Sequence, residues 1–347
     1  MMRKLFGLLF LLVVIGAYLH YVQGWDWARA RRDPRVTLFW PEDASATTTP
    51  IGQRGAGTHW ETARPMPGPR SDFGAAVAGN TIYVVGGIDG YFRTLSSAIA
   101  YDIGADAWRE IPRLPQAVHH PAVATDGVKI YVVGGLTGLA SRPIDDAYAY
   151  DPQKGEWEQL GRLNDFRGAA AADTLDGKLY VAGGATTAGA SDAFEYYDDA
   201  RKGWNGLRSM PTPRTHLAAA GVDGKFYTIG GRRGSLTKNF GTTEAFDFKR
   251  NEWVPSPDLA VPRSSHAAAE RGGLIYVLGG ETKQGNVAEI EVFDPKKNAW
   301  TTLPLAMPNP RHGLAAVAWK DRIYAIGGGR RSGFSVSDLN EVLILAK

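Results

Sequence analysis

Five arginines stand at one fixed distance from a pair of glycines. Each lies sixteen positions before the first glycine of its pair, and a valine takes the sixth equivalent position: Arg70, Arg167, Arg214, Arg263, Arg311 and Val118. If these guanidinium groups converge around one opening, they suit bidentate capture of a carboxylate, sulfate or phosphate. The alternative is that each arginine binds backbone carbonyls of its own connector and braces it. The sequence leaves both interpretations open.

Other basic residues and histidines stand near the same motifs. Basic residues follow two of the glycine pairs in an irregular way: Arg232, Arg233, Lys238, Arg330 and Arg331. Histidines gather ahead of the next strands: His119, His120, His216, His266 and His312. The predicted ligand-binding set adds these residues to the five arginines: His216, His312, Arg232, Arg233 and Arg330. We predict no metal site, because no carboxylate accompanies the histidines at ligand spacing.

Residues for catalysis are sparse. Glu281 or Asp89, paired with His216 or His312, would supply an acid and a base for sugar chemistry, although all four lie in loops or connectors. The chain has no cysteine, which excludes disulfides, thiolate metal sites and cysteine nucleophiles. It also lacks a glycine-rich phosphate loop, a Gly-x-Ser-x-Gly elbow and a His-Glu-x-x-His helix. We therefore assign no catalytic residue and expect no cofactor.

The elements that must position these residues come from an internal repeat. Glycine pairs follow apolar runs at spacings of 47 to 49 residues: Gly86-Gly87, Gly134-Gly135, Gly183-Gly184, Gly230-Gly231, Gly279-Gly280 and Gly327-Gly328. A tyrosine stands three residues before each pair, and a tryptophan stands further ahead of it at a near-constant distance: Trp60, Trp108, Trp157, Trp204, Trp253 and Trp300. Six copies in phase predict six equivalent structural units.

Each unit predicts a four-stranded antiparallel meander. A small-residue strand such as Ala218-Ala219-Ala220 is followed by a tight turn and then by the tyrosine strand. The predicted two-residue turns are Asp126-Gly127, Asp176-Gly177, Asp223-Gly224 and Gly272-Gly273. An alternating strand ending in aromatic-Asp and the tryptophan strand complete the unit. Radial packing of six such sheets covers every apolar face, which predicts an all-β, six-bladed propeller.

The tryptophan count predicts how the ring closes. Trp60 precedes the first set of inner strands, and the last unit stops after its third strand at Asn340–Lys347. Residues 58–62 should therefore add the fourth strand to the last blade. The glycine pair, tyrosine and tryptophan resemble the kelch repeat over residues 57–346, in six-bladed kelch proteins of bacterial type. The resemblance implies a propeller domain at 57–347, and the absence of cysteine excludes the copper-oxidase activity of some kelch-like enzymes.

Charge is unevenly distributed along the chain. Residues 36–347 hold 33 basic and 34 acidic residues, so no nucleic-acid partner is expected. We define the loop face as the connectors (64–72, 112–121, 161–169, 207–216, 255–265, 303–312) and the loops after the glycine pairs (88–97, 136–146, 185–192, 232–243, 281–287, 329–338). It holds 17 basic and 9 acidic residues. An anionic partner would be drawn to this face.

The N-terminal segment predicts membrane targeting. Arg3 and Lys4 precede an apolar run from Leu5 to Leu19, so residues 1–24 suit a signal peptide or an uncleaved anchor. Residues 25–56 suit a linker. We expect an extracytoplasmic, periplasmic or membrane-anchored protein, with membrane contact through this segment if it is not cleaved.

Two functions fit these features. The first is a binding module of the cell envelope that holds a protein or an acidic glycan on the loop face. The alternative is an acidic-sugar enzyme resembling the sialic acid mutarotases, that is, an N-acetylneuraminate epimerase-like protein. A carboxylate in the mouth with a raised pKa would favour the enzyme. Exposure of Tyr91, Phe92, Phe240 and Phe334 would favour a partner.

Overall fold

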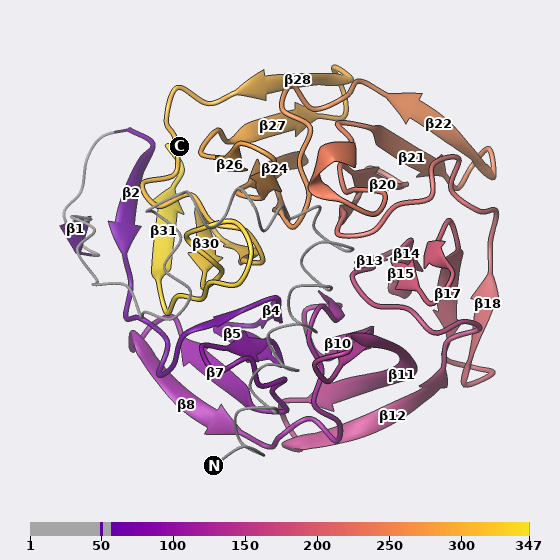
Figure 1. The fold of residues 1–347 in the computed structure, drawn as a ribbon, viewed down its shortest axis with the longest axis horizontal. Coiled ribbons are helices and arrows are strands. Elements are labelled where there is room, and N and C mark those ends of the chain that lie inside the picture. The colour runs from indigo at the N-terminus through magenta and orange to yellow at the C-terminus, as the bar shows by residue number, and fades with distance from the viewer. Residues whose placement is uncertain (1–48, 51–56, 347) are drawn as a thin grey trace, which may run out of the picture.

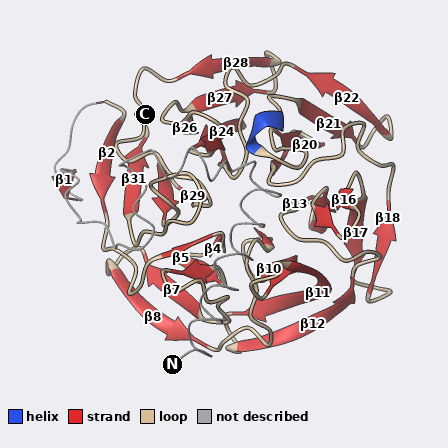
Figure 2. Cartoon of the chain, viewed as in Figure 1, coloured by secondary structure: helices blue, strands red, loops and turns tan. Residues whose placement is uncertain are grey.

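The computed structural model describes Thr49–Pro50 and residues 57–346, and it arranges them as six sheets around one axis (Figure 1). Nearly all regular structure is strand, as Figure 2 shows. The only helix within the described residues is one 3-10 turn, η1 (Leu236–Lys238). The predicted all-β, six-bladed propeller is confirmed.

Each blade is an antiparallel sheet whose first strand lies nearest the axis. Blades 1 and 2 contain β4 (Gly74–Ala78), β5 (Thr81–Val85), β7 (Ala98–Asp102), β8 (Ala107–Ile111), and β9 (Ala122–Thr125), β10 (Ile130–Thr137), β11 (Arg142–Asp151), β12 (Glu156–Arg162). Blades 3 and 4 contain β13 (Ala171–Leu175), β14 (Lys178–Ala182), β17 (Phe194–Asp198), β18 (Gly203–Gly206), and β19 (Ala218–Val222), β20 (Lys225–Ile229), β21 (Thr243–Asp247), β22 (Glu252–Ser256). Blades 5 and 6 contain β23 (Ala267–Arg271), β24 (Leu274–Leu278), β27 (Glu291–Asp294), β28 (Ala299–Thr302), and β29 (Ala315–Trp319), β30 (Arg322–Ile326), β31 (Asn340–Ile344).

Blade 6 is completed by the N-terminal end of the propeller. Strand β2 (His59–Thr62) pairs with β31, with Trp60 opposite Leu343. The Trp60 indole donates to the carbonyl of Ala306 at 2.9 Å. This confirms the predicted closure. A further strand, β1 (Thr49–Pro50), runs parallel to β2 at the outer edge, inside the stretch that the sequence predicts as a linker.

Three short strand pairs lie on the loop face. They are β3 (Arg70–Ser71) with β6 (Ile88–Asp89), β15 (Ala185–Thr186) with β16 (Gly189–Ala190), and β25 (Glu281–Thr282) with β26 (Gly285–Asn286). Two of the pairs, β15 with β16 and β25 with β26, make the loops of blades 3 and 5 short hairpins, whereas β3 with β6 joins the first connector to the loop of blade 1.

The core lies between neighbouring blades, because each sheet buries both of its faces. One cluster joins Ile82 and Tyr101 of blade 1 to Val317 and Tyr324 of blade 6. The repeated tryptophans tie the blades at the rim: the Trp108 indole, for example, donates to the carbonyl of Arg64 in the preceding connector at 2.9 Å. The small inner residues permit six strands to crowd around the axis.

The hairpin turns follow the prediction with one exception. Asp176-Gly177, Asp223-Gly224 and Gly272-Gly273 have positive φ at both positions, as a type I′ turn requires. The prediction for Asp126-Gly127 is wrong, because β9 ends at Thr125 and β10 begins at Ile130, which leaves a four-residue turn. There the Asp126 carboxylate accepts the backbone N–H groups of Val128 and Lys129. That side chain stabilises a wider turn and exposes Val128 at its tip.

The predictions for residues 1–24, and for residues 25–56 apart from β1, lie outside the described residues. In the described part of the chain, no helix is long and apolar enough to cross a membrane.

Candidate functional site

The connectors and the loops after the glycine pairs meet on one side of the propeller. Isolated backbone bridges join His119 to Leu136, Thr215 to Arg232, and His312 to Gly329. Each bridge connects the end of a connector to the start of the loop in the same blade. The loop face therefore exists as one surface around the axis.

The arginine ring lies inside that surface. Arg167, Arg214, Arg263 and Arg311 have no exposed surface, and Arg70 is 6% exposed. Four of the five form ion pairs with a glutamate on the third strand of the same blade: Arg167 with Glu195, Arg214 with Glu244 at 2.7 Å, Arg263 with Glu291 at 2.5 Å, and Arg311 with Glu341. Burial lowers the pKa of all four arginines, while the partner glutamates oppose that shift.

The contacts of these arginines explain why each lies at a fixed distance from a glycine pair. The Arg214 guanidinium donates to the carbonyl of Gly230, the first glycine of its own blade, at 2.8 Å. The backbone carbonyl of Arg214 accepts the N–H of Gly184, the second glycine of the preceding blade, at 2.9 Å. Each arginine thus fastens its own sheet and the neighbouring sheet. This is the geometry of the bracing alternative, and the guanidinium groups do not converge on an open mouth.

Glycine is required at these pairs by both conformation and space. Both residues of every pair have positive φ, for example Gly134 at 57° and Gly135 at 122°. A Cβ on Gly134 would lie 2.3 Å from the carbonyl oxygen of Arg167. The arginine and the glycine pair are therefore two halves of one structural joint.

Blades 1 and 2 depart from this pattern. Arg70 donates to the carbonyl of Gly86 at 3.1 Å, and its blade has Ile99 at the position that corresponds to Glu195 and Glu291. Burial lowers the pKa of Arg70 to about 10. Val118 packs in the core between blades 1 and 2 instead.

The other predicted ligand residues divide between the interior and the surface. Arg232 and His312 are buried at the inner end of the loop face, His216 and Arg330 are half-buried, and Arg233 is exposed. Arg232 forms an ion pair with Glu281 at 2.9 Å and donates to His216 Nε2 at 3.0 Å. Because a guanidinium only donates, His216 Nε2 must accept, and its Nδ1 donates to the Thr215 hydroxyl at 2.8 Å. Burial and then Arg232 lower the pKa of His216 well below its ordinary value.

A ring of backbone hydrogen bonds surrounds the axis at this end. One residue from each blade donates its N–H to the carbonyl of the preceding member, at 2.6 to 2.9 Å: Asp72, His120, Ala169, His216, Ser265 and Gly313. All six have φ between 51° and 56°. Sequence reasoning missed this ring because five different residue types occupy its six positions. Its signal is spacing alone, since the members recur every 47 to 49 residues.

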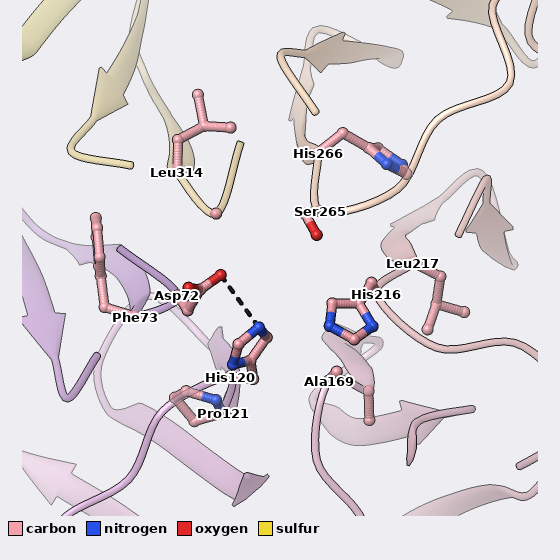
Figure 3. A pocket seen from close by; sticks show the side chains of 12 residues that line it. Asp72, Phe73, His120, Pro121, Ala169, His216, Leu217, Ser265, His266 and Leu314 are labelled. Atoms are coloured by element: carbon pink, nitrogen blue, oxygen red, sulfur yellow. Dashed lines mark ion pairs between the residues drawn. The ribbon is translucent and has the colours of Figure 1, made fainter. Parts of the chain in front are cut away.

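The side chains of this ring line a cavity of about 90 Å³ on the axis (Figure 3). His120 and His216 face each other across it, with ring centroids 4.9 Å apart. The Asp72 carboxylate accepts from His120 Nε2 at 3.1 Å, and His120 Nδ1 lies 2.7 Å from His119 Nδ1. Gly313 leaves room for Asp72, because a Cβ there would lie 2.4 Å from its carboxylate oxygen.

The electrostatics do not favour acid catalysis by Asp72 in the cavity or by Asp89 in the loop of blade 1. Burial alone would raise the pKa of Asp72, but the charge of His120 and its hydrogen bond outweigh burial and hold that pKa well below its ordinary value. Asp89 is likewise held low, against the effect of burial, by its bonds from Arg93. Burial and then His120 lower the pKa of His119 to about 3. Within the described residues, no group of three or more His, Asp or Glu is arranged to hold a metal ion.

Apolar side chains gather on the loop face rather than on the opposite face. In the described part of the chain, five large hydrophobic residues are exposed: Tyr91 at 80%, Val128 at 56%, Leu139 at 56%, Phe166 at 51% and Phe334 at 38%. Four of the five belong to the loop face. Val128 lies on the opposite side, which we name the turn face because it carries the turns between the first and second strands of the blades. Phe92 and Phe240 are half-buried. Phe92 contacts Phe334 edge to face, with centroids 4.6 Å apart.

The fold and the loop face place this chain in a class of six-bladed propellers. In this class, a glycine pair and a loop follow the second strand of each blade. The family model described as the KLHDC2/KLHL20/DRC7 Kelch-repeats domain matches residues 161–328, and the Kelch motif matches residues 69–115 and 117–164. The chain belongs to the kelch-repeat proteins.

Curated relatives agree with this assignment. The chain is 29% identical to kelch-like protein terF of Aspergillus terreus, over 78% of this chain and 63% of terF. It is 39% identical to human kelch-like protein 40, but over only 22% of this chain and 13% of that protein. The chain thus spans less than two thirds of either relative. A solved structure titled "Structure of YjhT" shares the fold, with a TM-score of 0.71, 16% identity, and coverage of 82% of this chain and 97% of that chain.

Proposed function

We propose that this chain is a binding module that holds a partner protein on the loop face. The observation that carries the proposal is the exposure of Tyr91, Leu139, Phe166 and Phe334 on that one face. Large apolar side chains that gather on one surface mark sites of protein–protein contact, and aromatic residues are enriched where partners bind. Four of the five arginines predicted to capture a small anion are paired with glutamates inside the blades.

The ends of the propeller support this use of the loop face. Leu345 donates to the carbonyl of Asp321 in the turn between β29 and β30, and Ala346 donates to the Thr58 hydroxyl. Both ends therefore lie on the turn face, opposite the loop face. A tether or tag attached at either end leaves the loop face accessible to a partner.

A photoreactive phenylalanine analogue tests the proposal in the cell that makes the protein. We expect the analogue at Tyr91 to yield a discrete cross-linked protein adduct. The matched analogue at Val128, the exposed apolar residue of the turn face, should yield none. Equal adducts from both positions, or an adduct from Val128 only, would refute the proposal.

A sugar-isomerising enzyme is the second candidate, because Glu281 and His216 both contact the Arg232 guanidinium at the mouth of the axis. During ring opening of an acidic sugar, Glu281 would take the proton of the anomeric hydroxyl and His216 would protonate the ring oxygen, while the Arg232 cation holds the acidic group of the sugar. Proton NMR of N-acetylneuraminate mutarotation checks this candidate. An acceleration that is lost in Glu281→Gln would support it, and an unchanged spontaneous rate would exclude it.

A further inference from the structure

Four neighbouring loops of the loop face are joined into one continuous ridge. We name the four-loop ridge for residues 232–243, 281–287, 329–338 and 88–97. The Asn239 amide donates to the carbonyl of Glu281 at 2.8 Å, and the Asn286 amide donates to the carbonyl of Gly329 at 2.9 Å. The contact between Phe334 and Phe92 completes the chain of loops. These contacts fix the loops of blades 4, 5, 6 and 1 to one another, so the ridge is one continuous surface.

Among the six loops after the glycine pairs, the positive charge is concentrated on this ridge. Its four loops hold seven basic and three acidic residues, whereas the two remaining loops, 136–146 and 185–192, hold one basic and three acidic residues. Two of the ridge carboxylates are used internally, since Glu281 pairs with Arg232 and Asp89 pairs with Arg93 at 2.6 Å. Further cations are exposed along the ridge: Arg233, Lys238 and Lys283. The ridge therefore presents a net positive surface.

The apolar groups occupy one end of the same ridge. Tyr91 and Phe334 are exposed where the loops of blades 6 and 1 meet, and the Arg93 guanidinium lies 5.3 Å from the centre of the Tyr91 ring. A ligand that covers this end must present a large apolar group. A ligand that extends along the ridge must present negative charge. A polypeptide carries both an apolar side chain and acidic side chains. Large apolar side chains that fill a contact site dominate the binding energy of interfaces, and complementary charge adds specificity.

We infer that the four-loop ridge binds an acidic peptide segment that also carries a bulky apolar side chain. The apolar side chain packs on Tyr91 and Phe334, and the acidic side chains face Arg233 and Lys283. This inference rests on the proposed function and names the chemistry of its partner. It places binding along the ridge, to one side of the axial cavity, because the exposed cations and the exposed apolar side chains lie on the loops and not among the residues that line that cavity.

The test uses the full chain, purified in mild detergent and immobilised through a C-terminal tag. Three probes are titrated by biolayer interferometry: a glutamate-rich peptide containing phenylalanine, the same peptide with serine in place of phenylalanine, and oligogalacturonate. We expect the phenylalanine peptide to bind most tightly and to weaken as salt rises. Lys283→Glu and Tyr91→Ser should each weaken that peptide by roughly fivefold or more.

Matched variants on the turn face serve as controls. Lys249→Glu reverses an exposed cation of blade 4, and Val128→Ser removes the exposed apolar residue of that face. Both should leave the affinity unchanged. Tighter binding of oligogalacturonate, equal effects of ridge and control variants, or no binding of either peptide would overturn the inference. The proposed function would survive any of these results if cross-linking at Tyr91 still captured a partner that Val128 does not.

Discussion

At the scale of single residues, the regular spacing of the five arginines does not reveal what their side chains contact. The fixed distance to the glycine pair marks Arg214 and its counterparts as equivalent positions, but the direction of each guanidinium depends on the third strand. Glu244, its partner, lies 30 residues later in the chain. Only strand pairing brings that carboxylate to the arginine, so sequence reasoning could state the bracing role as an alternative but could not decide it.

We expect Arg214→Ala to lower the free energy of unfolding by about 3–5 kcal/mol, because it leaves the Glu244 charge buried and unpaired. Arg70→Ala should cost less, since the Arg70 guanidinium donates to a carbonyl and not to a carboxylate. Urea denaturation of the two variants compares these costs. Equal losses in both would contradict the role of the ion pair.

His266 makes stability depend on pH. Burial, and then Arg263, lower its pKa from 6.5 to about 3. Below about pH 6.5, His266 of the unfolded chain binds a proton, whereas His266 of the folded chain does not bind one until the pH approaches 3. The free energy of unfolding should therefore fall as the pH is lowered from about 6.5 towards 3. His266→Leu, which copies Leu217 and Leu314 at the equivalent positions, should flatten that slope. Melting temperatures measured between pH 7 and pH 4.5 check this, and an unchanged slope would contradict it.

At the scale of elements, the repeat made most of the fold predictable. Strand order, the type I′ turns and the closing strand at Trp60 follow from six motifs in phase. The turn at Asp126 was not predictable, because two extra residues change its geometry without changing the Asp-Gly signal. The axial ring was also not predictable, because its members share a backbone conformation and not a residue type.

Removal of the closing strand should be costly. A chain that starts at residue 66 lacks β2, which leaves the edge of β31 unpaired and removes the Trp60 bond to Ala306. We expect its thermal midpoint to lie well below that of a chain that starts at residue 50. Calorimetry on the two chains gives the comparison, and coincident midpoints would show that β2 does not hold the ring closed.

At the scale of the whole molecule, the charge of the loop face needs a correction. The excess of basic residues counted from sequence includes four arginines whose glutamate partners lie on the third strands, outside the counted segments. Those four charges are neutralised inside the blades. The remaining asymmetry belongs to the four-loop ridge, which could not be recognised until the contacts between its loops were known.

Export of the propeller is a separate prediction. Arg3 and Lys4 followed by the apolar run to Leu19 should direct residues 36–347 across the membrane. We expect alkaline phosphatase fused after Lys347 to be active in a bacterial host. An inactive fusion that is nevertheless produced would place the propeller in the cytoplasm.

The central claim is that partners bind the loop face and not the axis, the rim or the turn face. Hydrogen–deuterium exchange of the full chain, measured alone and with the partner captured through Tyr91, tests it most directly. We predict slower exchange in residues 88–97 and 329–338 on binding, and unchanged exchange in the turn at Asp126–Lys129. Protection confined to that turn or to the outer strands of the blades would contradict the claim.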